Sequence, residues 1–160
     1  MKKYLILIGL LYFGYKKMVV MNLKNIEKAE FRGFDMFLSS GVMIAYDKFK
    51  GMLDGQCMIS PAKHAILRFD IDLKKTTDHY LGRALDVMLT GDHTLRQAYN
   101  FGVQAGFNAI GIYPFWKPYK GLHLGVRYPV IENKIYKWSD MSRISGKHDY
   151  QSYEKGFNYG

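Results

Sequence analysis

Residues 77–87 read TDHYLGRALDV, and this stretch decides the fold that the sequence predicts. Apolar positions continue to Leu89, so residues 83–89 are typical of a β-strand, in which alternate side chains share a face. Asp86 then lies in the middle of an otherwise apolar strand. Leaving a buried carboxylate without a partner is very costly, so Asp86 is expected to be paired or bound to a metal.

A histidine precedes this acid. His79 lies just before Gly82, and a glycine permits backbone conformations that other residues avoid. The chain can turn there and double back along itself. The sequence therefore predicts that the side chains of His79 and Asp86 meet at one point.

A second strand-like segment offers a third ligand. Residues 121–127 read GLHLGVR, and His123 interrupts their apolar pattern. A single histidine in such a strand is commonly a core residue. Three polar residues in two strand-like segments favour a metal, and two histidines with one carboxylate form a catalytic zinc set whose fourth position is open to water.

These two stretches resemble the motifs of the zinc D-Ala-D-Ala carboxypeptidase-like metallopeptidases. The family pattern is Ser/Thr-x-His-x-x-Gly-x-Ala-x-Asp-Val/Ile, followed later by Gly-Ile/Val-Tyr-Pro and His-x-Asp-x-Arg. Residues 77–87 match the first part, and residues 111–127 match the second except at Gly125, where the family has Asp. The resemblance covers about residues 40–130, and it implies that His79, Asp86 and His123 bind Zn²⁺.

The resemblance also implies a fold and an activity. The family includes phage endolysin-type and bacterial cell-wall peptidases with the hedgehog/D-Ala-D-Ala peptidase fold. We therefore expect an α+β domain: a small antiparallel sheet with helices packed on one face. The expected activity is zinc-dependent hydrolysis of an amide bond in a peptidoglycan peptide. The alternative is a catalytically degenerate structural or binding protein, part of a virion or membrane, that keeps this fold.

Catalytic and substrate-binding candidates follow from the same likeness. Relatives carry a Glu or His shortly before the last ligand as the general base, but residues 119–122 here read YKGL, which leaves Lys120 and Asp78 as candidates. The family also holds the substrate carboxylate with a loop arginine, and Arg68 is the candidate in loop 61–76. Trp116 and Tyr119, in the loop before His123, are expected to flank the substrate cleft.

The rest of the chain supplies the surrounding elements. Helices are expected at residues 41–53 and 94–105, the first ended by Asp54-Gly55 and the second capped by Asp92. Short apolar runs predict further strands at 56–60, 107–113, 122–127 and 134–138. Asp86 and His123 should lie on neighbouring strands, with both helices packed on the other face of the sheet.

Composition limits the partners. The chain has 160 residues, of which 48% are hydrophobic, so it can form one domain with a substantial core. Its net charge of +9 suits an anionic partner: nucleic acid, acidic lipid or cell-wall polymer. No nucleic-acid-binding motif is present, so we expect cell wall or membrane and no nucleic acid. The single cysteine, Cys57, excludes an internal disulfide.

The N-terminus predicts a link to a membrane. Residues 4–15 are an uncharged apolar run between Lys2-Lys3 and Lys16-Lys17. This pattern is typical of a signal or anchor segment, although a strand or helix of the core is the alternative. The expected organisation is a hydrophobic segment at residues 1–21 and a peptidase-like domain at 22–160. The expected location is membrane-associated, in a virion or in the periplasm or cell envelope.

Overall fold

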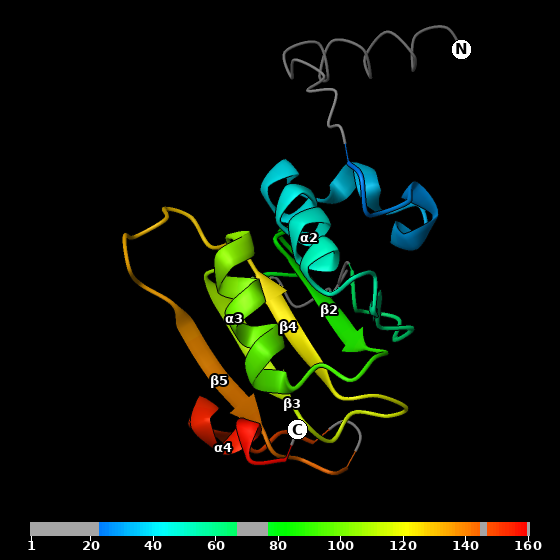
Figure 1. The fold of residues 1–160 in the computed structure, drawn as a ribbon. Helices are drawn as coiled ribbons and strands as arrows, with labels where there is room; N and C mark the ends of the chain where they lie inside the picture. Colours follow the sequence, from blue (N-terminus) through cyan, green and yellow to red (C-terminus); the bar gives the residue numbers. More distant parts are fainter. Residues whose placement is uncertain (1–22, 67–76, 145–146, 160) are drawn as a thin grey trace, which may run out of the picture.

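A six-stranded sheet organises the protein. The computed structural model describes residues 23–66, 77–144 and 147–159 (Figure 1). The strand order is β1-β2-β4-β3-β5-β6. Their bounds are Cys57–Ile59 for β1, Ala84–Leu89 for β2, Ala109–Tyr113 for β3, Gly121–Gly125 for β4, Tyr136–Asp140 for β5 and Tyr150–Gln151 for β6.

The sheet is mixed, so the prediction of a wholly antiparallel sheet is wrong. Strands β3 and β5 pair in parallel, and every other neighbouring pair is antiparallel. The reason lies in the connection after β4. Gly125, at the end of β4, and Tyr136, at the start of β5, both lie beside Ala109, the first residue of β3. The loop 126–135 therefore returns at the end of the sheet where β3 begins, and β5 must run in the same direction as β3.

Helix α2, Ser40–Met52, agrees with the predicted helix at 41–53. Its N-cap is Ser39, whose hydroxyl accepts a hydrogen bond from the backbone N–H of Val42. It ends in the expected turn, where Asp54 and Gly55 both have positive φ. Its buried apolar face consists of Val42, Met43, Ala45, Tyr46 and Phe49.

Helix α3, Leu95–Ala105, also agrees with the prediction, but its cap is different. Thr94, not Asp92, is the N-cap. Its hydroxyl accepts from the backbone N–H of Gln97 at 3.1 Å, and the Gln97 side chain accepts from the N–H of Thr94 at 2.9 Å. This reciprocal capping box satisfies two donors at once, which a cap at Asp92 would not do. Gly106 ends the helix with φ 108°.

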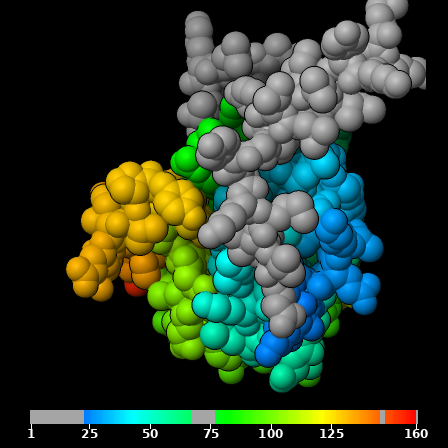
Figure 2. All heavy atoms as spheres, turned by 90° about the horizontal axis from the view of Figure 1, so that it is seen from above, coloured from blue at the N-terminus to red at the C-terminus, as the bar shows by residue number. Residues whose placement is uncertain are grey.

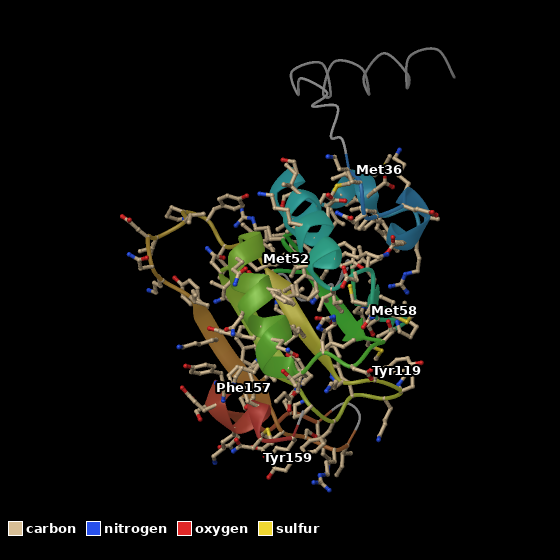
Figure 3. All side chains as sticks on the ribbon, in the orientation of Figure 1. Met36, Met52, Met58, Tyr119, Phe157 and Tyr159 are labelled. Carbon is tan, nitrogen blue, oxygen red and sulfur yellow. The ribbon has the colours of Figure 1, made fainter. Side chains whose placement is uncertain are left out.

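The apolar core lies on one face of the sheet. Alternate residues of β2, β3 and β4 belong to it. Helices α2 and α3 cover that face of the sheet (Figure 1). Helix α4, Tyr153–Phe157, joins the same layer, because Tyr99 of α3 contacts the rings of Tyr153 and Phe157 at centroid distances of 5.6 and 5.5 Å (Figure 3). Helices on one face leave the other face of the central strands for Asp86, His123 and their neighbours.

The remaining described segments are peripheral. Two short 3-10 turns, η1 at Lys28–Phe31 and η2 at Asp35–Phe37, precede α2. The loop 126–135 projects from the edge of the molecule (Figure 2). The predicted hydrophobic segment at residues 1–21 lies outside the described residues. None of the helices in the described ranges has the length and hydropathy of a membrane span.

Candidate metal centre

Neighbouring strands bring Asp86 and His123 together. Strands β2 and β4 are antiparallel, and Asp86 lies directly opposite His123 in their register. Residues directly opposite in such a pair have Cβ atoms only about 4.5–5.5 Å apart, so their side chains meet. Both side chains point away from the helices, because Leu85, Val87, Leu122 and Leu124 occupy the helix-covered face. The acid in the apolar strand therefore meets a histidine.

A tight turn delivers His79 to the same place. The turn is closed by backbone hydrogen bonds from Arg83 to Asp78, 2.8 Å, and from Gly82 to His79, 3.1 Å. Gly82 has φ 63°, and a Cβ at this position would overlap the backbone carbonyl of Phe37. Only glycine fits both the conformation and the space. The expected doubling back of the chain at Gly82 is therefore observed.

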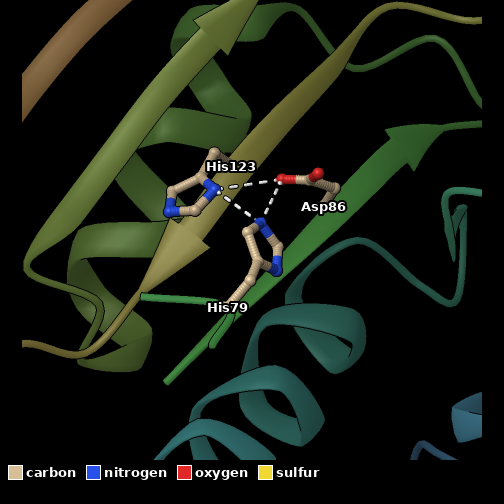
Figure 4. A group of neighbouring side chains, drawn as sticks. All are labelled: His79, Asp86 and His123. Atoms are coloured by element: carbon tan, nitrogen blue, oxygen red, sulfur yellow. Dashed lines mark hydrogen bonds and ion pairs between the residues drawn. The ribbon is translucent and has the colours of Figure 1, made fainter. Parts of the chain in front are cut away.

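The three side chains form a nearly equilateral triangle of ligand atoms (Figure 4). Nε2 of His79 lies 3.1 Å from Oδ1 of Asp86 and 3.1 Å from Nδ1 of His123, and the third edge, from His123 to Asp86, is 3.0 Å. Tetrahedral zinc with bonds of about 2.0–2.1 Å separates its ligand atoms by roughly 3.3 Å. The residues therefore fit a zinc ion after a small outward movement of each ligand.

Proton placement also favours a cation. If both histidines donate to Asp86, their two N–H groups face each other across the 3.1 Å contact between His79 and His123. If one nitrogen is unprotonated, its own contact with Asp86 joins two acceptors. With neutral rings, no arrangement of protons satisfies all three edges. A cation bound by all three atoms does, because each then offers a lone pair.

The charges around the triangle are strongly coupled. Burial favours the neutral form of Asp86, but His123 and His79 outweigh it and lower the pKa of this carboxyl to about 2. Burial likewise works against the charged form of His123, but Asp78 and Asp86 outweigh it and raise the pKa of this imidazole to about 9. The site thus holds excess negative charge and attracts a positive species, either a proton or a metal ion.

Asp78 contacts the outer side of His123. Its Oδ2 lies 3.9 Å from Nε2 of His123 and accepts a hydrogen bond from Nε of Arg127 at 2.8 Å. Burial raises the pKa of Asp78, but His123 and Arg127 outweigh that effect and lower it. A weakly basic carboxylate suits an orienting role better than the proton-accepting role predicted for Asp78. The other histidine differs: among the described residues, the buried Nδ1 of His79 has no hydrogen-bond partner.

Glycines let aromatic rings lie flat on the sheet beside the triangle. A Cβ at Gly111 would lie 2.6 Å from the indole of Trp138, and one at Gly121 would lie 2.5 Å from the indole of Trp116. Tyr113 joins the two: its ring stacks on Trp116 at 4.2 Å, and its hydroxyl accepts from Nε1 of Trp138 at 3.3 Å. These three rings are fixed walls of the site.

A cavity of about 550 Å³ opens over the triangle. It is large enough for part of a peptide or another small ligand. The lining residues are Thr77, Asp78, His79, Asp86, Tyr113, Trp116, His123, Arg127, Trp138, His148 and Tyr150. A neighbouring cavity of about 370 Å³ shares Asp86, Trp116 and His148 with the first, so the two form a continuous groove.

Some predicted site residues lie elsewhere. Lys120 and Tyr119 line neither cavity. Lys120 precedes the first residue of β4, Gly121, and is partly exposed there. Tyr119 is exposed at the tip of the β3–β4 connection (Figure 3). Trp116 does line the cavity, and Arg68 lies outside the described residues.

Sequence reasoning gave no role to several residues of the cavity, among them Arg127, Trp138 and His148. Arg127 was present in the motif but was given no role, and its pairing with Asp78 depends on a fold contact. Trp138 comes from β5, and His148 comes from the segment before β6. No local pattern marks them, because pairing of β3 with β5, and of β5 with β6, brings them to the site.

The geometry is therefore that of an open metal site with two imidazoles and one carboxylate, set against an aromatic wall. It provides three ligands, an oriented outer carboxylate and room for a ligand above them. Comparison of the chain with protein family models, curated proteins and solved structures finds no match.

Proposed function

We propose that the protein is a zinc-dependent hydrolase that cleaves an amide bond in peptidoglycan peptides. The observation that carries this proposal is the triangle of His79, Asp86 and His123 on the floor of a cavity. Catalytic zinc sites have three protein ligands and an open position, whereas structural sites are closed by four.

Each residue has a chemical part in this proposal. The triangle holds the ion, which supplies Lewis acidity toward a carbonyl oxygen and makes water more acidic. Asp78 and Arg127 fix the ring of His123 from behind. Trp116, Tyr113 and Trp138 exclude water from one side of the reacting amide and orient the substrate against the sheet.

The substrate class rests on the motif resemblance and on charge. The groove beside the triangle carries Lys117, Arg143 and Lys147, which suit the carboxylates of peptidoglycan stem peptides. Arg68 remains a candidate for the same task. The net charge of +9 favours encounter with an anionic wall, and residues 4–15 are proposed to hold the protein at a membrane. The proposed setting is a phage virion or a cell envelope.

A second candidate is a degenerate protein that keeps the fold and the ion but has lost turnover. One observation favours it: none of residues 119–122, which read YKGL, places a carboxylate or an imidazole beside the triangle. Such a protein would serve as a structural or binding component of a virion or membrane. A zinc-loaded protein without turnover would support this candidate.

The test measures zinc and hydrolysis together. Purified protein should contain one zinc per chain by elemental analysis and should release new amino groups from purified peptidoglycan. His123→Ala should lose both while the far-ultraviolet circular dichroism stays unchanged. His93→Gln is the matched control, because His93 lies beside Phe101 of α3, on the helix side of the sheet. Undiminished hydrolysis by His123→Ala would rule out this site as the source of the activity.

A further inference from the structure

A second carboxylate–imidazole pair lies beside the cavity that contains the triangle. Nδ1 of His148 lies 2.6 Å from Oδ2 of Asp140, the last residue of β5. His148 lines both parts of the groove, and its side chain is 57% exposed, whereas that of Asp140 is only 5% exposed. A buried acid thus holds an accessible imidazole beside the cavity.

Asp140 is held firmly in its charged form. Its other oxygen, Oδ1, accepts hydrogen bonds from the backbone N–H groups of Ser142 and Asp149, each at 3.0 Å. Burial raises the pKa of Asp140, but the N–H of Asp149, the His148 ring and the N–H of Ser142 outweigh it and lower the pKa. An ionised Asp140 can only accept a hydrogen bond from the ring, so it selects the His148 tautomer that carries hydrogen on Nδ1.

The ring plane of His148 is also fixed. Its ring stacks on Tyr150 with a centroid distance of 5.1 Å and an interplanar angle of 6°. When Nδ1–H of a neutral ring donates to Asp140, the lone pair of the ring is on Nε2. A neutral imidazole with an acidic partner on one nitrogen and a lone pair on the other is the arrangement used for general bases.

His148 is not placed as a fourth ligand. In the described part of the chain, the group whose ligand atoms all lie within 4.8 Å of one another contains His79, Asp86 and His123 and does not include His148. His148 nevertheless lines the same cavity. The cavity that the triangle and His148 both line, about 550 Å³, is large enough to hold water together with part of a substrate.

We propose that His148, oriented by Asp140, is the proton-transfer residue of the site. The inference rests on the proposed hydrolase function, and it supplies the general base that residues 119–122 lack. Nε2 of His148 takes a proton from water as the water oxygen bonds to the amide carbon. The carbon–nitrogen bond then breaks, and the proton passes from Nε2 to the departing amine. The products are one carboxylic acid and one amine, from one amide and one water.

The test uses His148→Gln, Asp140→Asn and the control His93→Gln in the full chain. His148→Gln should lower kcat on soluble cross-linked wall peptides by about 10²–10⁴-fold, the usual contribution of a general base. KM should change little and zinc content should not change. Asp140→Asn should lower kcat less, because the base remains but loses its orientation.

A second readout does not depend on turnover. Nitrogen-15 NMR of metal-free protein at alkaline pH should show the Nδ1–H tautomer of His148 in the wild type. Asp140→Asn should lose that preference, and His93→Gln should keep it. A wild-type ring protonated on Nε2 would overturn the proposed orientation.

The outcomes separate the two proposals. Wild-type hydrolysis that His148→Gln retains in full overturns the role of His148 alone. Loss of zinc from His148→Gln makes it a ligand and also overturns that role. A zinc-loaded wild type that cleaves no wall peptide overturns the proposed hydrolase, and the role of His148 with it.

Discussion

Raising the pH after zinc is removed should destabilise the fold, by an amount that His123 determines. Asp78 and Asp86 raise the pKa of His123 to about 9 in the folded protein, against an ordinary value of about 6.5 in an unfolded chain. A folded pKa above the unfolded pKa means that the protonated ring stabilises the folded state. This stability is fully present below about pH 6.5 and is lost as the pH rises through about 9.

The size of the effect follows from this difference. Each pKa unit corresponds to about 1.4 kcal/mol, so the contribution lost between about pH 6 and pH 9 is about 3 kcal/mol. That is a large part of the stability of an ordinary domain, about 5–15 kcal/mol. Zinc should remove the dependence, because a metal-bound imidazole has no proton to lose in this range.

The assay is urea unfolding in the presence of a chelator, followed by the fluorescence of the two tryptophans, Trp116 and Trp138. His123→Gln is the reference, because it keeps all other titrating groups, including the Cys57 thiol, whose pKa burial raises to about 12. The wild type should lose about 3 kcal/mol more than the variant over this pH range. Equal losses in the two proteins would refute the charge coupling described for the triangle.

Three further predictions concern single positions. Asp78→Asn should weaken zinc binding by about 10–100-fold in competition with a chromophoric chelator, because Asp78 orients His123, and unchanged affinity would contradict that role. Gly121→Ala should cost roughly 1–3 kcal/mol in urea unfolding, because its Cβ would lie 2.5 Å from both Trp116 and the carbonyl of Val87; a variant as stable as the wild type would show that Trp116 does not lie against the sheet. Lys120→Gln should leave kcat/KM and zinc content unchanged, since the side chain lines neither cavity, and a large loss of kcat would support Lys120 as a catalytic residue.

Local patterns were enough to predict the floor of the site. Period-two alternation isolates Asp86 and His123 from the apolar residues beside them, and the two strands pair with these residues opposite each other. Gly82 marks the turn that returns His79, since only glycine adopts that conformation without strain at such close approach. The alternation and the turn depend on residues within short stretches, so the sequence records them directly, whereas the register of Asp86 opposite His123 joins strands distant in the chain.

Lys120 was chosen as a catalytic candidate because it lies close to His123 in the sequence. Only the folded arrangement shows that it lines neither cavity. The prediction of Asp92 as a cap failed because the reciprocal bond between Thr94 and Gln97 satisfies two backbone donors. That cap was predicted from one residue without the partner three positions beyond the true cap.

The walls of the cavity could not be predicted in this way. Trp138 and His148 reach the site because β5 pairs with β3 in parallel and β6 pairs with β5. The strand order depends on where loop 126–135 brings the chain back to the sheet, beside the start of β3. No residue type in the loop specifies that position. Pairing between strands distant in the chain decides which side chains face the metal.

The division of the sheet into two faces has an evolutionary consequence. The hydrophobic core that stabilises the fold lies on the helix-covered side, and the three candidate ligand residues lie on the other side. A substitution of His79, Asp86 or His123 therefore leaves the apolar interior intact. Under the proposed function, descendants of such a protein can lose the ion in one mutational step and persist as folded, inert components, and a single reversion can restore the ion. Gly125, where related motifs carry an acid, occupies this permissive side of the scaffold.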